Sequence, residues 1–117
     1  MNIYSYIRRQ TMGTLPLLTT KTTEMLSDLF KTLGDSTRIK IICSLFQGEK
    51  CVHEISDLLE MTPSAVSHQL RILKQSSLAK CRRDGRHMRY SLDDNHVEEI
   101  FRLGLIHIEH IHKEPLK

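Results

Sequence analysis

The sequence predicts a mainly α-helical domain that carries one small β-hairpin. Apolar residues recur at spacings of three and four in several segments before residue 76 and again after residue 93, which is typical of amphipathic helices. Asp84-Gly85 lies between two short runs, residues 78–83 and 86–92, and favours a two-residue hairpin turn. The chain has 117 residues, no tryptophan and 5% aromatic residues, so we expect one domain with a modest, mostly aliphatic core.

The first third of the chain is expected to hold an arm and a helix. Residues 1–20 show no clear period, so we expect a flexible N-terminal arm, followed by a single domain over residues 21–117. A first helix is predicted from about Thr22 to Leu33, because apolar residues keep helical spacing there and Gly34 can end the run.

Two further helices are expected before the middle of the chain. The second is predicted to begin after a cap at Asp35 or Ser36 and to stop at Gly48. Its apolar residues suggest a place in the core, and they are Ile39, Ile41, Ile42, Leu45 and Phe46. A short third helix is predicted over Cys51–Leu59. The side chains expected to face inward on it are Ile55, Leu58 and Leu59.

A fourth helix has a strong start signal and two distinct faces. Thr62 can cap it, and Pro63 fits the first helical position, where no N–H bond is lost. Its apolar residues Val66, Leu70 and Leu73 fall within about 60° of one another. The opposite side carries Ser64, Ser67, His68, Arg71 and Gln75. A helix-turn-helix needs such a helix to place small polar side chains against base edges, although an ordinary surface helix is the alternative.

The hairpin that follows is basic and is predicted to act as a wing. Met88, Tyr90 and Leu92 alternate with Arg89 and Ser91, which gives one face to the core and one to solvent. The whole chain has a net charge of only +3, but residues 71–89 hold seven lysines and arginines against a single acid. The predicted DNA-binding residues are Ser64, Ser67, His68, Gln69, Arg71, Lys74, Arg82, Arg83 and Arg86. A solubilising run of charge is the alternative.

A last helix is predicted from Asp94 to about His110, with Pro115 closing it. At about 100° per residue, His107 lies about 20° round the axis from His96, and His110 about 40° to the other side. The three imidazoles therefore share one face. At about 1.5 Å per residue, however, His96 and His107 stand roughly 16 Å apart, whereas zinc holds its ligands at about 2 Å. One helix cannot close a site on a single ion.

Two antiparallel copies of this helix could close such a site across a two-fold axis. Each dimer would hold two equivalent sites, built from Asp94 and His96 of one chain with His107 and His110 of its partner. Asp94 at the N-cap can turn toward the same ion as His96. Three nitrogens and one carboxylate oxygen suit Zn(II) or Co(II). The alternative is a dimer helix with solvated histidines, and His112 shows that a histidine here need not be a ligand.

The cysteines and the apolar runs indicate in which compartment the protein is expected. Cysteines number three, an odd count without the spacing of a disulfide framework. We find no signal peptide and no membrane-length apolar run, so we expect a reducing cytoplasm and no membrane partner.

With these residues in view, the chain resembles the ArsR/SmtB family of metal-responsive winged-helix repressors. The phrases that carry the resemblance are LGDSTRIKII, SAVSHQLRILK, DGRHMRYSL and DDNHVEEIFRLGLIHIEH, within residues 29–112. The spacing Asp-x-His-x10-His-x2-His is specific for the zinc- and cobalt-sensing members. The resemblance implies a winged helix-turn-helix, a homodimer through the first and last helices, and metal ligation by Asp94, His96, His107 and His110.

The resemblance also implies a function. Members of this type bind double-stranded operator DNA as metal-free dimers and release it on binding metal, which controls metal efflux or resistance genes. Zn(II) or Co(II) is the expected ion, with Ni(II) and Cd(II) as further candidates. A second site type in the family uses cysteines at the start of the third helix and ligands from the arm. This chain departs from it, because Cys51 and His53 have no cysteine or histidine before Cys43 to join them.

Three alternatives stay open at this point. The first is a winged-helix repressor switched by oxidation of Cys43, Cys51 or Cys81. The second is a metal-dependent hydrolase. Protein ligands would fill all four coordination positions of the metal and leave none for water, which argues against this alternative. The third is a pure dimerisation module, which leaves the basic wing without a purpose. We therefore expect a DNA-binding regulator and not an enzyme.

Overall fold

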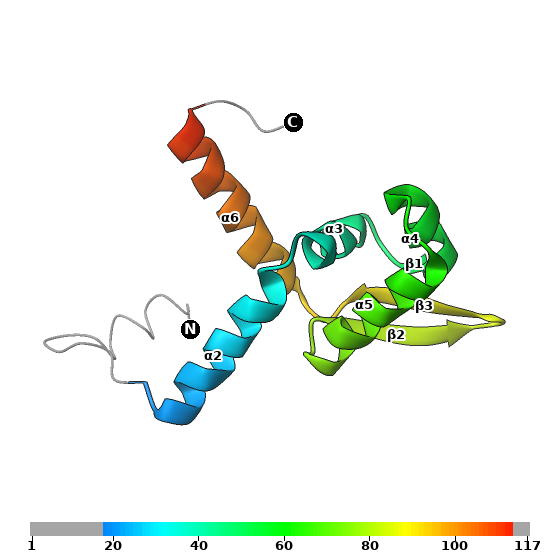
Figure 1. The fold of residues 1–117 in the computed structure, drawn as a ribbon, viewed down its shortest axis with the longest axis horizontal. Coiled ribbons are helices and arrows are strands. Elements are labelled where there is room, and N and C mark those ends of the chain that lie inside the picture. Colours follow the sequence, from blue (N-terminus) through cyan, green and yellow to red (C-terminus); the bar gives the residue numbers. More distant parts are fainter. Residues whose placement is uncertain (1–17, 114–117) are drawn as a thin grey trace, which may run out of the picture. The chain divides into compact units, whose positions relative to one another are not determined.

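The computed structural model describes residues 18–113 of the chain (Figure 1). The chain divides into two units, one ending at Lys31 and the other beginning at Thr32. Most of the predicted N-terminal arm, residues 1–17, lies outside the described residues, so the arm stays a prediction.

Helix α2 (Thr20–Leu33) matches the predicted first helix. At its start, the side-chain oxygen of Thr19 accepts a hydrogen bond from the backbone N–H of Thr22 at 3.1 Å. Several large apolar side chains of α2 are exposed, namely Met25, Leu26 and Phe30. An amphipathic helix with an exposed apolar stripe is suited to pack against a further surface.

Helix α3 (Ser36–Ser44) follows the end of α2 and belongs to the second unit. The carboxylate of Asp35 caps it, because Oδ2 accepts the backbone N–H of Arg38 at 3.0 Å. The helix was predicted to run to Gly48 but ends at Ser44, and a turn leads from there to Gly48, whose φ is +128°. The glycine therefore ends the turn and not the helix.

Two residues predicted to face inward are exposed, and both predictions were wrong. Ile39 is 36% exposed, because it lies about 160° round the helix from the buried Ile41 and about 60° from the buried Ile42, at the edge of the buried face. Leu58 is 59% exposed on helix α4 (Val52–Leu59), whereas Ile55 on the same helix is fully buried.

Helices α4 and α5 (Pro63–Gln75) form the predicted pair of helices joined by a tight turn. Glu60 ends α4 in the left-handed conformation with φ +55°, and its backbone N–H donates to the Ser56 carbonyl. The N–H of Met61 also donates to that carbonyl, at 3.1 Å, while the Ser56 hydroxyl donates to the Met61 carbonyl. These bonds satisfy the end of α4 and fix the direction in which α5 leaves.

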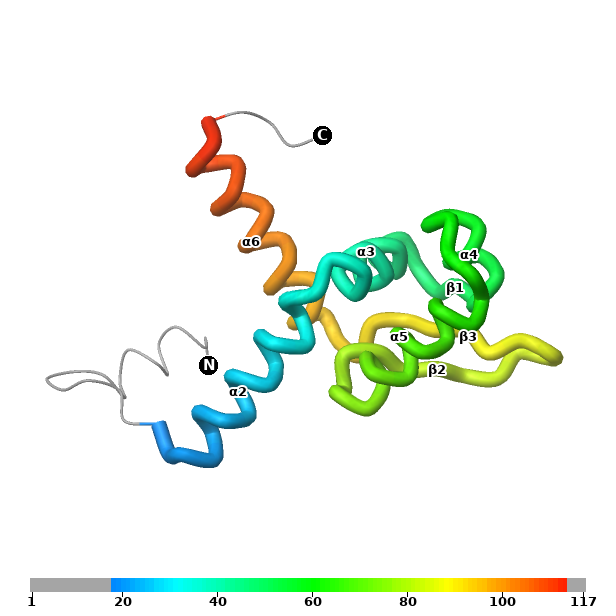
Figure 2. The backbone as a smooth tube through the Cα atoms, viewed as in Figure 1, coloured from blue at the N-terminus to red at the C-terminus, as the bar shows by residue number. Residues whose placement is uncertain are grey.

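A third strand joins the predicted hairpin. The sheet contains β1 (Lys50–Cys51), β2 (Ala79–Asp84) and β3 (His87–Leu92) in the order β1-β3-β2, with antiparallel neighbours. Cys51 is opposite Arg89 in this register. Cys51 was predicted to lie in a helix, because a strand of two residues is too short to show a period. Helix α5 runs beside the β2–β3 hairpin (Figure 2).

The hairpin turn lies one residue later than predicted. Asp84 pairs with His87, so the two linking residues are Gly85 and Arg86 and not Asp84-Gly85. Gly85 has φ +63° at the first linking position, where glycine is favoured because it has no Cβ. Arg86 therefore stands at the tip of the hairpin.

Helix α6 (Asn95–His112) confirms the predicted last helix and ends at Lys113. Its first half packs on the rest of the second unit, where Val97 is buried and the Phe101 ring meets the Phe46 ring edge-on at 6.2 Å. Its second half extends away from the sheet of this unit (Figure 1). Large apolar side chains are exposed along it, and they are Leu103, Leu105, Ile106, Ile108 and Ile111.

Truncation of a buried leucine in the second unit should cost far more stability than truncation of an exposed one. Leu70 is fully buried, so Leu70→Ala should lower the free energy of unfolding by about 2–5 kcal/mol, whereas Leu58→Ala should change it by roughly 0.5 kcal/mol or less. Chemical denaturation of both variants at one protein concentration measures the difference. Equal losses of unfolding free energy in the two variants would contradict the exposed position of Leu58.

Candidate metal centre and DNA-binding face

Helix α5 presents a polar face because its other face is buried. Oγ1 of Thr62 accepts the Ala65 N–H at 3.1 Å and Pro63 follows the cap, as predicted. The buried side chains are Val66, Leu70 and Leu73. Of the predicted DNA-binding residues on this helix, Ser64, His68, Arg71 and Lys74 are exposed and Ser67 is half-buried. Hydroxyl, imidazole and cationic groups thus stand together on one side of α5.

Gln69 lies in a different environment from the other candidates on α5. It is half-buried, and its side-chain oxygen accepts a hydrogen bond from Nη1 of Arg38 at 3.3 Å. Arg38 comes from α3, and its Nε also donates to the Thr32 carbonyl at 2.7 Å. Sequence analysis missed Arg38, because the contact joins residues 31 positions apart and depends on how two helices pack.

Acidic side chains neutralise Arg82 and Arg89 of the wing, and two of these acids, Glu49 and Glu54, lie outside the basic segment. Glu49 accepts two hydrogen bonds from the Arg82 guanidinium, both at 2.8 Å. Arg89 donates to Asp84 at 2.7 Å and to Glu54 at 3.3 Å. The hydrogen bond from Arg89 is the main reason that the pKa of Asp84 is lowered, and the one from Arg82 lowers the pKa of Glu49. These carboxylates therefore stay ionised at neutral pH.

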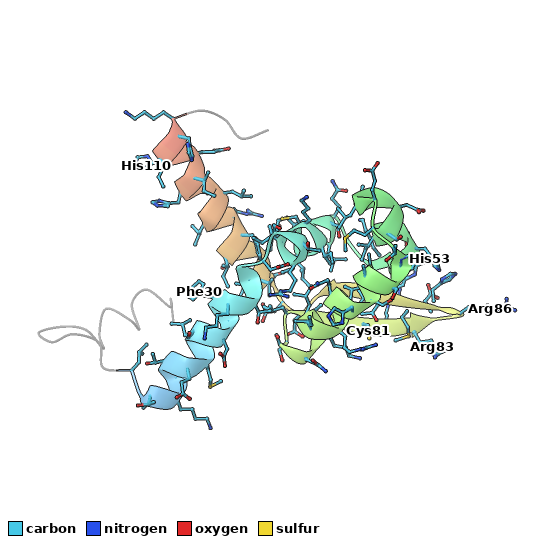
Figure 3. The ribbon with its side chains drawn as sticks, viewed as in Figure 1. Phe30, His53, Cys81, Arg83, Arg86 and His110 are labelled. Atoms are coloured by element: carbon cyan, nitrogen blue, oxygen red, sulfur yellow. The ribbon has the colours of Figure 1, made fainter. Side chains whose placement is uncertain are left out.

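The tip of the wing keeps its positive charge. Arg86 extends from the end of the hairpin and Arg83 lies beside it, both exposed (Figure 3). Among residues 18–113, no carboxylate pairs with either of them. The sequence had placed Arg82, Arg83 and Arg86 together as candidates, whereas in the structure Arg82 is engaged by Glu49.

Asp94 uses its two carboxylate oxygens differently at the start of α6. Oδ1 accepts the backbone N–H groups of His96 at 2.9 Å and Val97 at 3.3 Å, which confirms the predicted N-cap. Oδ2 lies 3.4 Å from Nδ1 of His96. Desolvation raises the pKa of Asp94, but the hydrogen bonds from Val97 and His96 outweigh it, so the pKa is lowered. An ionised oxygen and an imidazole nitrogen thus lie together, exposed to solvent.

The other two predicted metal ligands lie farther along α6. His107 and His110 are exposed, and His110 is near the distal end of the helix (Figure 3). Within the part of the chain that the structure describes, no three His, Cys, Asp or Glu side chains come together closely enough to hold a metal ion. One chain therefore brings together Asp94 and His96 but not the full set of four. The donor types fit Zn(II) or Co(II), provided that the remaining donors come from a second chain.

The cysteines do not form a second centre in this structure. Cys51 is buried in β1, and its backbone N–H donates to the Glu54 carboxylate at 3.1 Å, whereas His53 is exposed. Cys43 is half-buried, and desolvation raises the pKa of its thiol, which disfavours the reactive thiolate. All three cysteines, including Cys81, are free thiols.

Comparison with known proteins connects these features to a family. The family model described as bacterial regulatory protein, arsR family, matches residues 35–80. A Synechocystis protein named transcriptional repressor SmtB homolog is 38% identical over 74% of this chain and 65% of its own length. The regulator NmtR of Mycobacterium tuberculosis is 38% identical over 68% of this chain and 67% of its own length. The chain thus spans about two thirds of the length of these relatives.

Solved structures show the same similarity in three dimensions. The solution structure of apo-NmtR matches with a TM-score of 0.72 at 31% identity, covering 86% of this chain and 85% of that one. A homodimeric winged helix-turn-helix DNA-binding domain from Mycobacterium bovis matches with a TM-score of 0.73 at 25% identity, covering 86% and 96%. The predicted winged helix-turn-helix fold is confirmed. None of the helices described here is both long and apolar enough to span a membrane.

The Glu54 carboxylate should make stability depend on pH. Its pKa lies below the ordinary value of 4.5, mainly because it accepts the Cys51 N–H, so its contribution is present above about pH 4.5 and is lost as pH falls through the lower folded-state value. Glu54→Gln should therefore be less stable than the wild type at pH 7, with a gap that narrows in acid. Asp57→Asn, an exposed change on the same helix, is the control. Thermal unfolding across pH 3–7 tests this, and a gap that stays constant would contradict it.

Proposed function

Because the chain belongs to the ArsR family of bacterial regulatory proteins, we propose that it is a transcriptional repressor that responds to a divalent metal ion. As a member of a family of regulators, it is not an enzyme. The proposed repressor is a cytoplasmic homodimer that binds operator DNA without metal and releases it on binding Zn(II), with Co(II), Ni(II) and Cd(II) as further candidates. It would thereby control genes for metal efflux or resistance.

The observation that carries the metal response is the pair of donors at the start of α6. Oδ2 of Asp94 lies beside Nδ1 of His96, while Oδ1 remains bonded to the helix backbone. The carboxylate can therefore bind an ion through one oxygen without giving up the cap. Asp94 and His96 of one protomer, with His107 and His110 of its partner, would hold the ion. Bound there, the ion supplies a cross-link between the two chains.

The exposed surface of α6 supports a dimer that uses this helix. The apolar residues Leu105, Ile108 and Ile111 continue the stripe that begins at the buried Val97. Burial of such a stripe against a second copy would contribute roughly 25 cal/mol per Å² of apolar area. The similar domain from Mycobacterium bovis is itself described as homodimeric.

Metal and DNA would then act against each other through the arrangement of the dimer. Ligation by residues at both ends of α6 restricts how two protomers can be placed, while DNA requires half-sites about one helical turn apart. If the two ligands favour different arrangements, each weakens the other by the same factor. The first half of α6 packs on the rest of the second unit through the contact of Phe101 with Phe46, so a shift of α6 would also move the residues packed against it.

The proposed DNA contacts fall into two groups. The polar residues of α5, including the exposed Ser64 and His68 and the half-buried Ser67, would meet base edges in the major groove. Arg83 and Arg86 at the wing tip would meet phosphates or the adjacent minor groove, with Arg71 and Lys74 adding backbone contacts. Arg82 would contribute less, because its guanidinium already holds Glu49.

Cobalt spectroscopy tests the metal site directly. One Co(II) per chain added to the metal-free dimer should give intense tetrahedral bands in visible absorption, and His107→Ala should abolish them, because it removes one of four ligands. His112→Ala is the matched control, since that histidine is also exposed on α6 but is not a proposed ligand. Weak octahedral bands, or a thiolate band that survives His107→Ala, would place the site elsewhere and make Cys51 the next residue to test.

DNA binding can be tested with duplexes that the wild-type dimer selects from a random pool. Zn(II) should weaken binding of the selected duplex, and Arg86→Ala should weaken it in the absence of metal. The slope of log K against log salt should fall by about one, because a phosphate contact is lost. Arg102→Ala, which removes an equal charge from α6, should leave the slope unchanged. Failure to select any duplex would refute the proposed function.

A further inference from the structure

A hydrogen-bonded bridge joins α3 to the flank of α5, outside both the metal ligands and the polar face. Its centre is Arg38, whose Nε donates to the Thr32 carbonyl at 2.7 Å and whose Nη1 donates to Oε1 of Gln69 at 3.3 Å. The backbone N–H of Arg38 is fixed as well, because it donates to the Asp35 cap at 3.0 Å. The guanidinium therefore reaches Gln69 from an anchored position.

Gln69 borders the buried stripe of α5 and does not belong to its outward face. At about 100° per residue, Gln69 lies about 60° round the helix from the buried Val66, whereas His68 lies about 160° from Val66 in the same direction, nearly opposite to it. The half-buried state of Gln69 and the exposed state of His68 agree with these angles. The bridge thus holds α5 at its side, next to the residues that face outward.

The chemistry of the guanidinium determines which end of the Gln69 amide faces it. Arginine has only donors, so the atom it contacts must be the amide oxygen, and the NH₂ group points elsewhere. A glutamine that reads adenine uses its oxygen and its nitrogen together. Because the oxygen of Gln69 is already engaged by Arg38, Gln69 is better placed to hold its helix than to read a base.

We propose that Arg38 is a positioning residue for DNA recognition and that it acts through Gln69 to set the rotation of α5. Aliphatic packing of Val66, Leu70 and Leu73 gives this helix affinity for the core, but such packing has no direction of its own. The bridge supplies a directional contact, which decides how residues such as Ser64 and His68 meet the groove. This proposal rests on the DNA-binding function proposed above.

A double-mutant cycle on Arg38 and Gln69 tests the proposal. The quantity to measure is the ratio of affinities of the metal-free dimer for the selected duplex and for a scrambled duplex of equal length. The ratio cancels the phosphate attraction that both duplexes share. Arg38→Met and Gln69→Met should each lower it about tenfold, the effect of one lost hydrogen bond to a charged group. The double variant should lower it by no more than about tenfold, because both changes remove the same contact.

Gln69→Glu separates positioning from base recognition. Glutamate keeps an oxygen for Arg38 but loses the NH₂ group, so the ratio should stay within about threefold of the wild type. The added negative charge should weaken both duplexes in parallel. Thermal unfolding of every variant accompanies these measurements, since a purely structural role would lower stability and leave the ratio unchanged.

Three results would overturn the proposal. One is an additive cycle, with a loss of about a hundredfold in the double variant. Another is a Gln69→Glu variant as impaired as Gln69→Met, which would make Gln69 a direct DNA contact. The third is an unchanged ratio in Arg38→Met. None of these results affects the proposed DNA-binding function, which fails if the wild-type dimer selects no duplex.

Discussion

Burial of Val66, Leu70 and Leu73 on one side of α5 is the constraint on which the rest of the second unit depends. Once these side chains are withdrawn from water, most of the polar residues between them face outward, because they lie on other sides of the helix. The core also receives Ile41 and Ile42 from α3 and Ile55 from α4, so three helices share one small aliphatic centre, which the sheet extends through Ala79 and Cys51. The polar face of α5 is thus a consequence of apolar packing, and the hydrogen bonds at its cap and flank refine its orientation.

Helix α6 differs along its length in a way that fits a role between two chains. Its first turns are tied to the second unit by the buried Val97 and by the contact of Phe101 with Phe46. Its last turns carry exposed isoleucines and histidines without partners from the described part of the same unit. The first end of the helix is therefore packed, and its last end is exposed. A helix of this kind could transmit a change at a contact between two chains to the helices that carry the proposed DNA contacts.

Features that depend on neighbouring residues were predicted well from the sequence, whereas contacts between distant residues were not predicted. The Thr62-Pro63 start of α5 and the Asp94 cap of α6 depend on residues three positions apart or fewer, and both appear as expected. Strand β1 has only two residues and exists because β3 pairs with it, so no pattern in the sequence could reveal it. The hairpin turn was displaced by one residue, because either position places Gly85 within it. Glu49 and Glu54 lie more than thirty positions from the arginines of the wing that they contact, and Arg38 also lies more than thirty positions from Gln69.

The double duty of Asp94 gives half of the proposed metal site in advance. Its Oδ1 is held by backbone N–H groups of α6, and His96 lies in the first turn of the same helix. The backbone that carries these two donors is therefore already fixed, which lowers the conformational entropy lost when an ion binds. The entropic cost of assembly falls instead on the histidines of the second chain and on the encounter of the two helices. With two donors placed beside each other on one chain and two supplied by the partner, ion binding would depend on the geometry of the dimer, so the site would respond to the partner as well as to the metal.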